Sequence, residues 1–354
     1  MQLQCCTLLS NLASNGSNRP FLASPAVMGG LLSAMGNAID DSRTQEVASE
    51  ALLKFNLASA NNLWGAGESG VGILLQSMRK NTLHESIQAS CLGVLGSLAS
   101  HDISKDSMVL EGAIEVVVVA MQTYSASLIQ ERACACLRHL AYQNRNNKFA
   151  ISSAGGIDVI LNAMERHIDC ATVEDEACGA LWSLSFVPPN REKIVSLDGV
   201  SKLILAMRKF PGNASIQGRV CGSLSNLSLD FPDIIASMGG IKQIFGAMRN
   251  HADDDRVQEE ACTALARVAN NPTCRRTIAE TPGAIELIMA ARKYHGSIVA
   301  THAGFILWNL SFNDKCRPEM IRVGAMQIVD DLMDEHGEEI PEYLTMYQNN
   351  PVEP

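Results

Sequence analysis

The sequence is poor in aromatic and charged residues, which make up 5% and 19% of its 354 residues. Its apolar residues are scattered, and no run approaches the roughly 20 residues that a membrane-spanning helix needs. Residues 1–6 carry no basic side chain and do not resemble a secretory signal. The net charge of -10 and the pI of about 5.3 disfavour general binding to nucleic acids or anionic membranes. We therefore expect neither a membrane span nor a nucleic-acid partner.

The sequence also lacks the motifs of common active sites and metal centres. The glycine pairs at 65–67 and 70–72 are not followed by the lysine of a phosphate-binding loop. No Cys-x-x-Cys or His-Glu-x-x-His pattern occurs. The acidic run at 253–255 lacks the spaced oxygen ligands of a calcium loop. The sequence therefore predicts no enzyme activity, no cofactor, no metal ion and no small-molecule substrate.

Eleven cysteines are present, and several recur at one place in a repeated segment, six residues before its closing Leu or Val. These are Cys6, Cys134, Cys178, Cys221 and Cys262. A thiol that recurs in an apolar pattern acts as a small buried hydrophobe and does not indicate a disulfide framework. We therefore expect an intracellular protein in the cytoplasm, with the nucleus as the alternative.

The repeated segment is clearest at 176–185, which reads Glu-Ala-Cys-Gly-Ala-Leu-Trp-Ser-Leu-Ser. Its apolar residues fall at i, i+3, i+4 and i+7, so they share one face of a helix. The pattern returns at 220–228 and 261–269, and weaker copies end at 12–13, 57–58, 98–99, 140–141 and 310–311. A stripe of small and branched residues lets this helix lie close to several neighbours. It is therefore predicted to be the core helix of a stacked array.

A second periodic segment precedes each core helix and contains a small residue followed by Met. These methionines are Met35, Met78, Met121, Met164, Met207 and Met248, which gives a period of about 42 residues. Most of these segments follow a glycine that is expected to supply a positive φ after a short helix, at 112, 155–156, 199, 239–240, 283 and 324. The spacings Ser127–Gln130 and Asp255–Gln258 predict capping boxes at the start of two core helices.

With its glycine corner and its small-x-x-x-Leu-x-x-Leu-small helix, the sequence resembles the armadillo-repeat family. A Val/Ile-Gln pair at the entry of the core helix adds to the resemblance, at 87–88, 129–130, 216–217 and 257–258. The resemblance implies an all-α fold, a right-handed α-solenoid of armadillo-type three-helix repeats. Two-helix HEAT repeats are the alternative, which the recurrent glycine corner disfavours.

We expect the solenoid to occupy residues 1–335. Its units are a partial one at 1–13 and then 14–58, 59–99, 100–141, 142–185, 186–228, 229–269, 270–311 and 312–335. The start within a repeat indicates either a missing upstream portion or a shortened first repeat. Residues 336–354 hold several acidic residues and three prolines, so we expect an acidic, mobile tail.

A stacked array leaves one side of its core helices exposed as a concave groove. In the armadillo family this groove binds extended peptides, and the residue before the closing Leu is often an Asn that pairs with the ligand backbone. Here that place holds Asn11, Asn56, Ser97, His139, Ser183, Asn226, Arg267 and Asn309. Importin-α-like proteins also carry Trp four residues before the Asn. Gly222 and Phe305 stand there instead, so a nuclear-signal receptor is not expected.

Trp182 and Trp308 fall one step off the apolar stripe. A partly exposed Trp anchors a partner, whereas a buried one packs against the adjoining repeat, and the sequence leaves both interpretations open. Basic side chains in the groove either pair with acidic ones of a partner or are simply solvated. The candidate contact set in the groove is Arg138, His139, Trp182, Asn226, Arg267, Trp308 and Asn309.

Two functions fit these observations. The first is a non-catalytic scaffold or adaptor that holds an extended protein or peptide segment along the groove. The second is a regulatory armadillo arm of a larger multidomain signalling protein. The start of the sequence within a repeat favours the second, and the sequence does not identify the partner in either.

Overall fold

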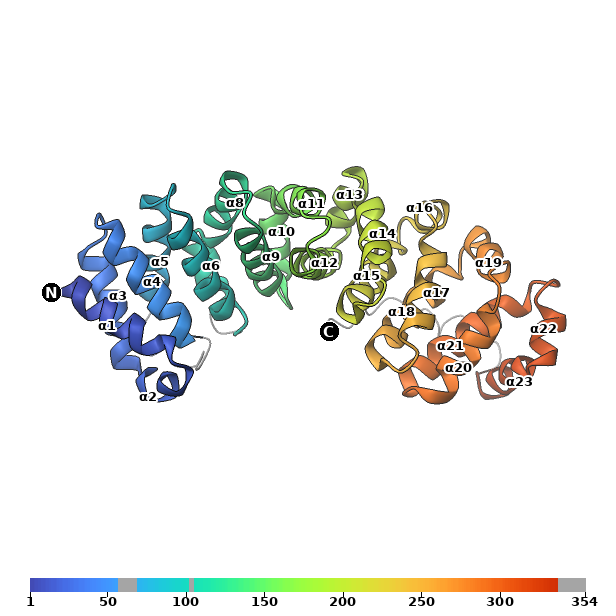
Figure 1. Cartoon of the computed structure of the whole chain (residues 1–354). Coiled ribbons are helices and arrows are strands. Elements are labelled where there is room, and N and C mark those ends of the chain that lie inside the picture. Colours follow the sequence, from blue (N-terminus) through green and yellow to red (C-terminus); the bar gives the residue numbers. More distant parts are fainter. Residues whose placement is uncertain (57–68, 102–104, 337–354) are drawn as a thin grey trace. The chain divides into compact units, whose positions relative to one another are not determined.

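The computed structural model describes residues 1–56, 69–101 and 105–336, and every regular element within these ranges is a helix (Figure 1). This confirms the predicted all-α class. The chain divides into two compact units, residues 1–180 and 181–354. The glycines at 65–67, the side chain of Asn56 and residues 337–354 of the predicted tail lie outside the described residues.

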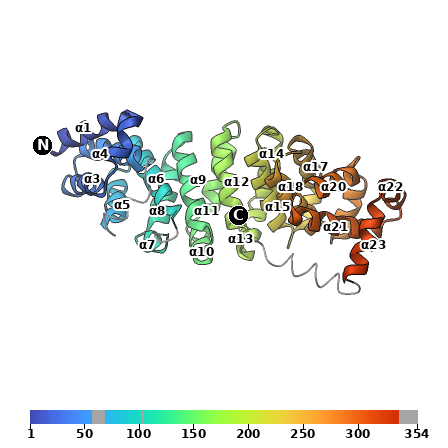
Figure 2. The same ribbon diagram turned by 90° about the horizontal axis from the view of Figure 1, so that it is seen from below.

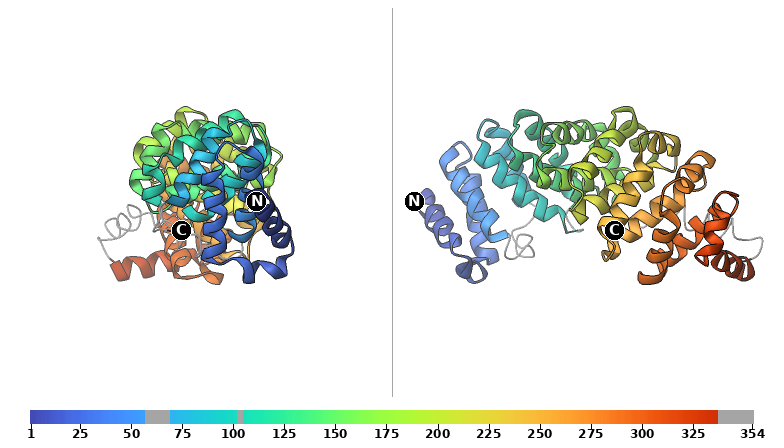
Figure 3. Two further views of the ribbon diagram at one scale, coloured as in Figure 1. Left: turned by 90° about the vertical axis from the view of Figure 1, so that its left-hand side faces the viewer. Right: turned by 45° about the vertical axis from the view of Figure 1, so that its right-hand side comes forward.

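In the first unit, each complete repeat consists of a short first helix, a second helix and a long third helix. The elements are α1 (Gln2–Ser14), the 3-10 helix η1 (Gly16–Asn18), α2 (Arg19–Leu22), α3 (Pro25–Asn37), α4 (Ser42–Asn56), α5 (Ser69–Lys80), α6 (Glu85–Ala99), α7 (Lys105–Leu110), α8 (Ala113–Thr123), α9 (Ser127–Ala141), α10 (Arg145–Ser153), α11 (Gly156–Arg166) and the start of α12 (Ala171–Leu184). The third helices α4, α6 and α9 pack against one another in sequence order (Figure 2). The segments on either side of 57–68, blue and cyan in Figure 3, also pack together.

The second unit repeats this three-helix pattern. Its helices after α12 are α13 (Pro188–Ser196), α14 (Gly199–Lys209), α15 (Ala214–Leu227), α16 (Pro232–Ser237), α17 (Gly240–Asn250), α18 (Asp255–Val268), α19 (Pro272–Ala279), α20 (Ala284–Tyr294), α21 (Ser297–Ser311), α22 (Arg317–Arg322) and α23 (Ala325–His336). The third helices α15, α18 and α21 again pack consecutively. The recurrent methionines of both units are buried, as are the five recurrent cysteines. The expectation that these positions belong to the core is confirmed.

The turn between the first and second helices has a positive φ in most repeats, at Gly112, Gly155, Gly239, Gly283 and Gly324. The prediction for Gly199 was wrong, because Asp198 takes the positive φ of 59° in that repeat. Gly199 is needed for a different reason. A Cβ at Gly199 would lie 2.7 Å from the carbonyl oxygen of Ile194, so only glycine allows the second helix to approach the first this closely.

The glutamine at the entry of the third helix fastens that helix to the one before it. The side-chain amide of Gln258 is buried and donates to the carbonyls of Met248 and His251, each at 2.9 Å. Gln45, Gln88, Gln130 and Gln217 make the equivalent pairs of bonds. The predicted capping boxes were therefore wrong. The side chain that caps α18 is Asp254, which accepts from the N–H of Val257, and Ser127 is already the first residue of α9.

Candidate functional site

The candidate residues predicted at the end of the third helices occupy one recurrent place, which we call the ladder position: the residue before the buried Leu, Val or Phe nearest the end of each third helix. In the described repeats it holds Ser97, His139, Ser183, Asn226, Arg267 and Asn309. Asn226 and Asn309 are each 2% exposed and Arg267 is 8% exposed. These three side chains are therefore buried.

In α4 the structure assigns the ladder position to Lys54 and not to Asn56. Gln45 donates to the carbonyl of Met35, ten residues earlier, as Gln217 does to Met207. Counting ten residues forward from Gln217 reaches Leu227, and the same count from Gln45 reaches the buried Phe55. The residue before Phe55 is Lys54. The sequence missed it because α4 has Phe55 at the place where the other copies have Leu or Val.

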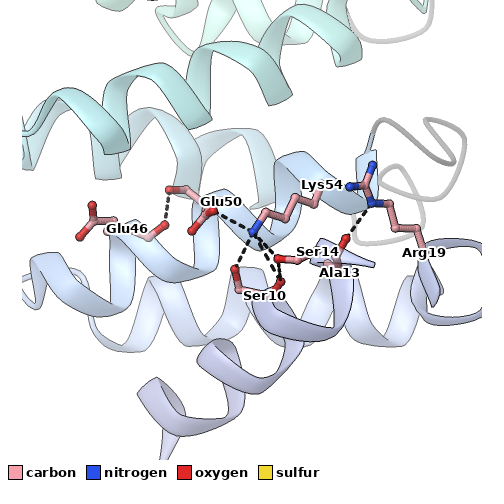
Figure 4. A network of polar contacts seen from close by, with 8 residues as sticks. Ser10, Ala13, Ser14, Arg19, Glu46, Glu50 and Lys54 are labelled. Atoms are coloured by element: carbon pink, nitrogen blue, oxygen red, sulfur yellow. Dashed lines mark hydrogen bonds and ion pairs between the residues drawn. The ribbon is translucent and has the colours of Figure 1, made fainter. Parts of the chain in front are cut away.

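Lys54 ties α4 to α1 (Figure 4). Its ammonium group donates to Ser10 Oγ at 3.2 Å and to Ser14 Oγ at 3.1 Å. It also forms an ion pair of 2.7 Å with Glu50, one turn earlier in α4. The charge is thus satisfied within the first unit, and the same close-up shows Arg19 donating to the carbonyl of Ala13 at 2.7 Å.

In α9 the predicted pair Arg138 and His139 makes contacts inside the first unit. His139 Nδ1 donates to the carbonyl of Gly96 in α6 at 2.8 Å. Burial, followed by the nearby charge of Arg138, lowers the pKa of His139. Arg138 Nε forms an ion pair of 2.7 Å with Glu176 of α12, and both side chains are partly exposed. A partner acid at Arg138 would therefore compete with Glu176.

In the second unit a polar network joins α15 and α18 to Ser185, the residue that follows α12. Asn226 Nδ2 donates to Ser185 Oγ at 3.0 Å. Arg267 Nη1 donates to Asn226 Oδ1 at 3.0 Å and to Ser225 Oγ at 2.9 Å. Both polar ends of the Asn226 amide are thus used within the protein. The network links neighbouring third helices, and an external backbone would have to displace these bonds to reach Asn226.

The Arg267 guanidinium is buried at some electrostatic cost. Burial lowers its pKa to about 10, and the Glu260 carboxylate partly offsets this. Burial likewise raises the pKa of Glu260 to about 7. Within the described residues, Arg267 Nε is buried with no hydrogen-bond partner. A buried cation of this kind stabilises its neighbours only while its hydrogen bonds hold.

Trp182 packs against the next repeat and is only 4% exposed. Its indole occupies the space over Gly222 of α15, where a Cβ would lie 2.5 Å from the ring nitrogen. The Arg256 guanidinium of α18 lies 5.4 Å from the ring centroid, a cation–π geometry. Of the two interpretations that the sequence left open for Trp182, the structure favours packing between repeats.

Trp308 is different, because it remains partly exposed on α21. Its ring meets Phe312 edge to face, with centroids 4.9 Å apart, and Phe312 is 63% exposed. Arg275 Nη1 donates to Asn309 Oδ1 at 3.1 Å, and Arg317 Nη2 donates to the carbonyl of Ser311 at 3.3 Å. We call Trp308, Phe312, Arg275 and Arg317 the α21 aromatic surface.

The structure thus separates the seven candidates into two kinds. Arg138, His139, Trp182, Asn226 and Arg267 make contacts between repeats, whereas Trp308 lies on a partly exposed surface with Asn309 beside it. Sequence reasoning missed Phe312 and Arg275, because neither lies in the repeated motif. A signal for Phe312 was present, since it follows Trp308 by four residues and so lies on the same face.

The described residues contain neither a helix able to cross a membrane nor a group of three or more metal-ligating side chains. A cavity of about 230 Å³ lies in the first unit, between α5 and α8. Its apolar lining is formed by Met78, Val116, Val119 and Ala120, and Arg79 and Glu115 also line it.

Segments of the chain are similar to two known proteins. The protein aardvark of Dictyostelium discoideum is 32% identical over 168 residues, which are 47% of this chain and 18% of that protein. The juxtamembrane domain-associated catenin of Caenorhabditis elegans is 37% identical over 70 residues, 19% of this chain and 6% of that protein. The matched part of this chain therefore spans less than a fifth of either relative. No protein-family model matches the chain.

Solved structures share the fold. An engineered protein superposes with a TM-score of 0.77 at 22% identity, covering 97% of this chain and 82% of that one. A structure from work on a phosphorylation switch in the interaction between cadherin and β-catenin has a TM-score of 0.57 at 17% identity, covering 87% and 66%. At these identities the structures show the fold alone. Together with the three-helix repeats and the glycine corners, they show that this chain has an armadillo-type fold.

Proposed function

We propose that the chain is a non-catalytic scaffold that holds an extended segment of a partner protein across α15, α18 and α21. The catenin-like relative supports a repeat protein that binds partners. The observation that carries the proposal is the α21 aromatic surface, where a partly exposed Trp308 lies beside Phe312. Tryptophans of this kind are enriched among the residues that dominate binding energy at interfaces.

Each candidate residue has a different part in this proposal. Trp308 and Phe312 pack against an apolar side chain of the partner segment, and Asn309 fixes Arg275 beside them. Asn226 and Arg267 act as positioning residues, because their hydrogen bonds set the spacing of α15 and α18. Trp182 supports the same spacing from α12 through its contact with Gly222. The buried thiols at the recurrent position favour a cytoplasmic location.

A random peptide library displayed on phage tests the proposal with the full chain as bait. We expect enriched peptides whose affinity falls about tenfold or more in Trp308→Ala, as for an interface residue of high energy. Tyr294→Ala is the matched control, because Tyr294 is 70% exposed in the same unit but lies outside the surface. An absence of enriched peptides, or equal binding to Trp308→Ala, would reject the proposal.

A second candidate is a regulatory arm of a larger protein. It is favoured by the small share of the two relatives that the matches cover, 18% and 6%. An antibody against α15–α18 applied to native extract separates the candidates. A band well above the 38.1 kDa of this chain supports the arm, and a band at that mass contradicts it.

A further inference from the structure

The α21 aromatic surface combines exposed apolar area with positive charge. Phe312 is 63% exposed, and Trp308 beside it is partly exposed. Arg275 approaches from α19 through its bond to Asn309, and Arg317 approaches from α22 through its bond to Ser311. Asp314, the carboxylate paired with Arg317, is 93% exposed and 3.7 Å away, so water largely screens that pair. This chemistry suits a segment with carboxylates and a bulky apolar side chain.

The sequence that follows α23 has this composition. Residues 337–354 carry four glutamates and no lysine or arginine. Glu338, Glu339 and Glu342 alternate with apolar residues at Ile340, Tyr343 and Leu344. We propose that the segment 338–347 of this chain binds the α21 aromatic surface of the same molecule, with Tyr343 or Leu344 against Trp308 and Phe312 and its glutamates beside Arg275 and Arg317.

The segment starts close enough to reach this surface. Leu332 of α23 lies against Gly304 of α21, since a Cβ at Gly304 would be 3.0 Å from Leu332 Cδ1. Gly304 and Trp308 are one turn apart on one face of α21. The remaining four residues of α23 add about 6 Å at 1.5 Å per residue. The seven residues from 337 to Tyr343 then span up to about 25 Å when extended.

Tethering makes even a weak contact effective. A short flexible connection gives an effective concentration on the order of 1 mM, so a segment with a dissociation constant of about 100 μM as a free peptide would occupy its site about nine-tenths of the time. The bound segment would cover the surface of the proposed function, and an external partner would have to displace it. The contact itself needs no external partner, so it stands or falls independently of the proposed function.

Fluorine NMR of the full chain, labelled with 5-fluorotryptophan, tests the contact. Trp308→Phe assigns the Trp308 resonance. We expect that resonance to shift and to become more solvent-accessible in a tail variant with Glu338→Gln, Glu339→Gln, Glu342→Gln and Tyr343→Ala. A matched control variant, Gln348→Ala with Val352→Ala, changes the same tail outside the segment and should leave the resonance unchanged. An identical Trp308 resonance in the wild type and the tail variant overturns the proposal.

Binding of a labelled synthetic peptide of residues 337–354 to the tail variant completes the test. We expect Phe312→Ala to weaken this binding about tenfold or more, as for an aromatic anchor. Arg275→Gln should also weaken it, with the exposed Arg276→Gln as its control, and Tyr294→Ala is the control for Phe312→Ala. Equal binding to Phe312→Ala and Tyr294→Ala overturns the assignment. Release of Trp308 on dilution of the wild type would mean that the tail of a second copy binds there, which also overturns it.

Discussion

Replacing Gly222 by alanine tests whether Trp182 is a packing residue between repeats. In the structure a Cβ at Gly222 would lie 2.5 Å from Trp182 Nε1 and 2.6 Å from Cζ2. The indole is 4% exposed and covered by Arg256, so it has little room to move. Overpacking of this kind costs about 1–3 kcal/mol. Alanine regains up to about 1 kcal/mol over glycine inside a helix, so we expect a net loss of up to about 2 kcal/mol.

Gly246 provides the matched control, because it lies inside α17 of the same unit and has no heavy atom within 4 Å of its ideal Cβ. Gly246→Ala should therefore stabilise the protein by about 0.5–1 kcal/mol through helix propensity alone. The two glycines differ in what surrounds them and not in the substitution made. Opposite signs in the two variants would thus isolate the contact with Trp182.

Hydrogen exchange of the α15 amides is the appropriate assay, because repeat proteins often unfold in parts and a single melting curve averages over them. Gly222→Ala should lower protection in α15. In a Trp182→Ala background the same substitution should raise it, since the obstructing ring is gone. Equal stabilisation by Gly222→Ala and Gly246→Ala, or the same effect of Gly222→Ala with and without Trp182, would refute the reasoning.

Three further predictions concern the core, the pH dependence and the backbone. Gln130→Leu removes two hydrogen bonds to backbone carbonyls and should lower the free energy of unfolding in urea by roughly 2–3 kcal/mol. The exposed Gln122→Leu should change it by no more than about 0.5 kcal/mol. Similar losses in the two variants would contradict the role of Gln130. Burial lowers the pKa of His302 to about 4 from 6.5, so the unfolded chain binds the proton first and stability falls as the pH drops through that window. When the pH is lowered to about 5, the melting temperature of His302→Gln should therefore fall less than that of the wild type. Glu260, whose pKa is raised to about 7, acts in the opposite direction, but it does so in both proteins. An equal fall in the two proteins would contradict the role given to His302. Asp198→Gly should raise the free energy of unfolding by about 0.5–1 kcal/mol, because glycine adopts the positive φ without strain, and the midpoint of urea unfolding should rise with it. A lowered midpoint would show that the aspartate side chain has a stabilising contact.

Several features of the fold could be predicted because they depend on local pattern. The three-helix repeat follows from apolar spacing of period 3.6 and from a glycine at the corner, which are properties of short segments. The buried methionines and cysteines recur at fixed offsets, so their core positions were also predictable. The family resemblance rested on the same offsets. These features need no knowledge of which repeats touch.

Other features were missed because two residues from different segments decide them. The entry glutamine matched a capping box by spacing, yet its amide bonds to carbonyls ten and seven residues earlier, as Gln258 shows. The ladder position of α4 shifted to Lys54 once the bond from Gln45 fixed the register. Gly199 was expected to have the positive φ, but Asp198 has it instead, and Gly199 is the residue that lies close to Ile194.

The sequence by itself determined which residues are helical, which face of each helix is apolar and how long one repeat is. Only the tertiary structure decided which of two similar tryptophans is exposed. Trp182 is covered because the next repeat offers Gly222 and therefore room for an indole ring, whereas Trp308 lies beside Phe312 and stays partly open to solvent. Exposure depends on the side chain that a neighbouring repeat places opposite, and periodicity within one segment carries no information about that neighbour.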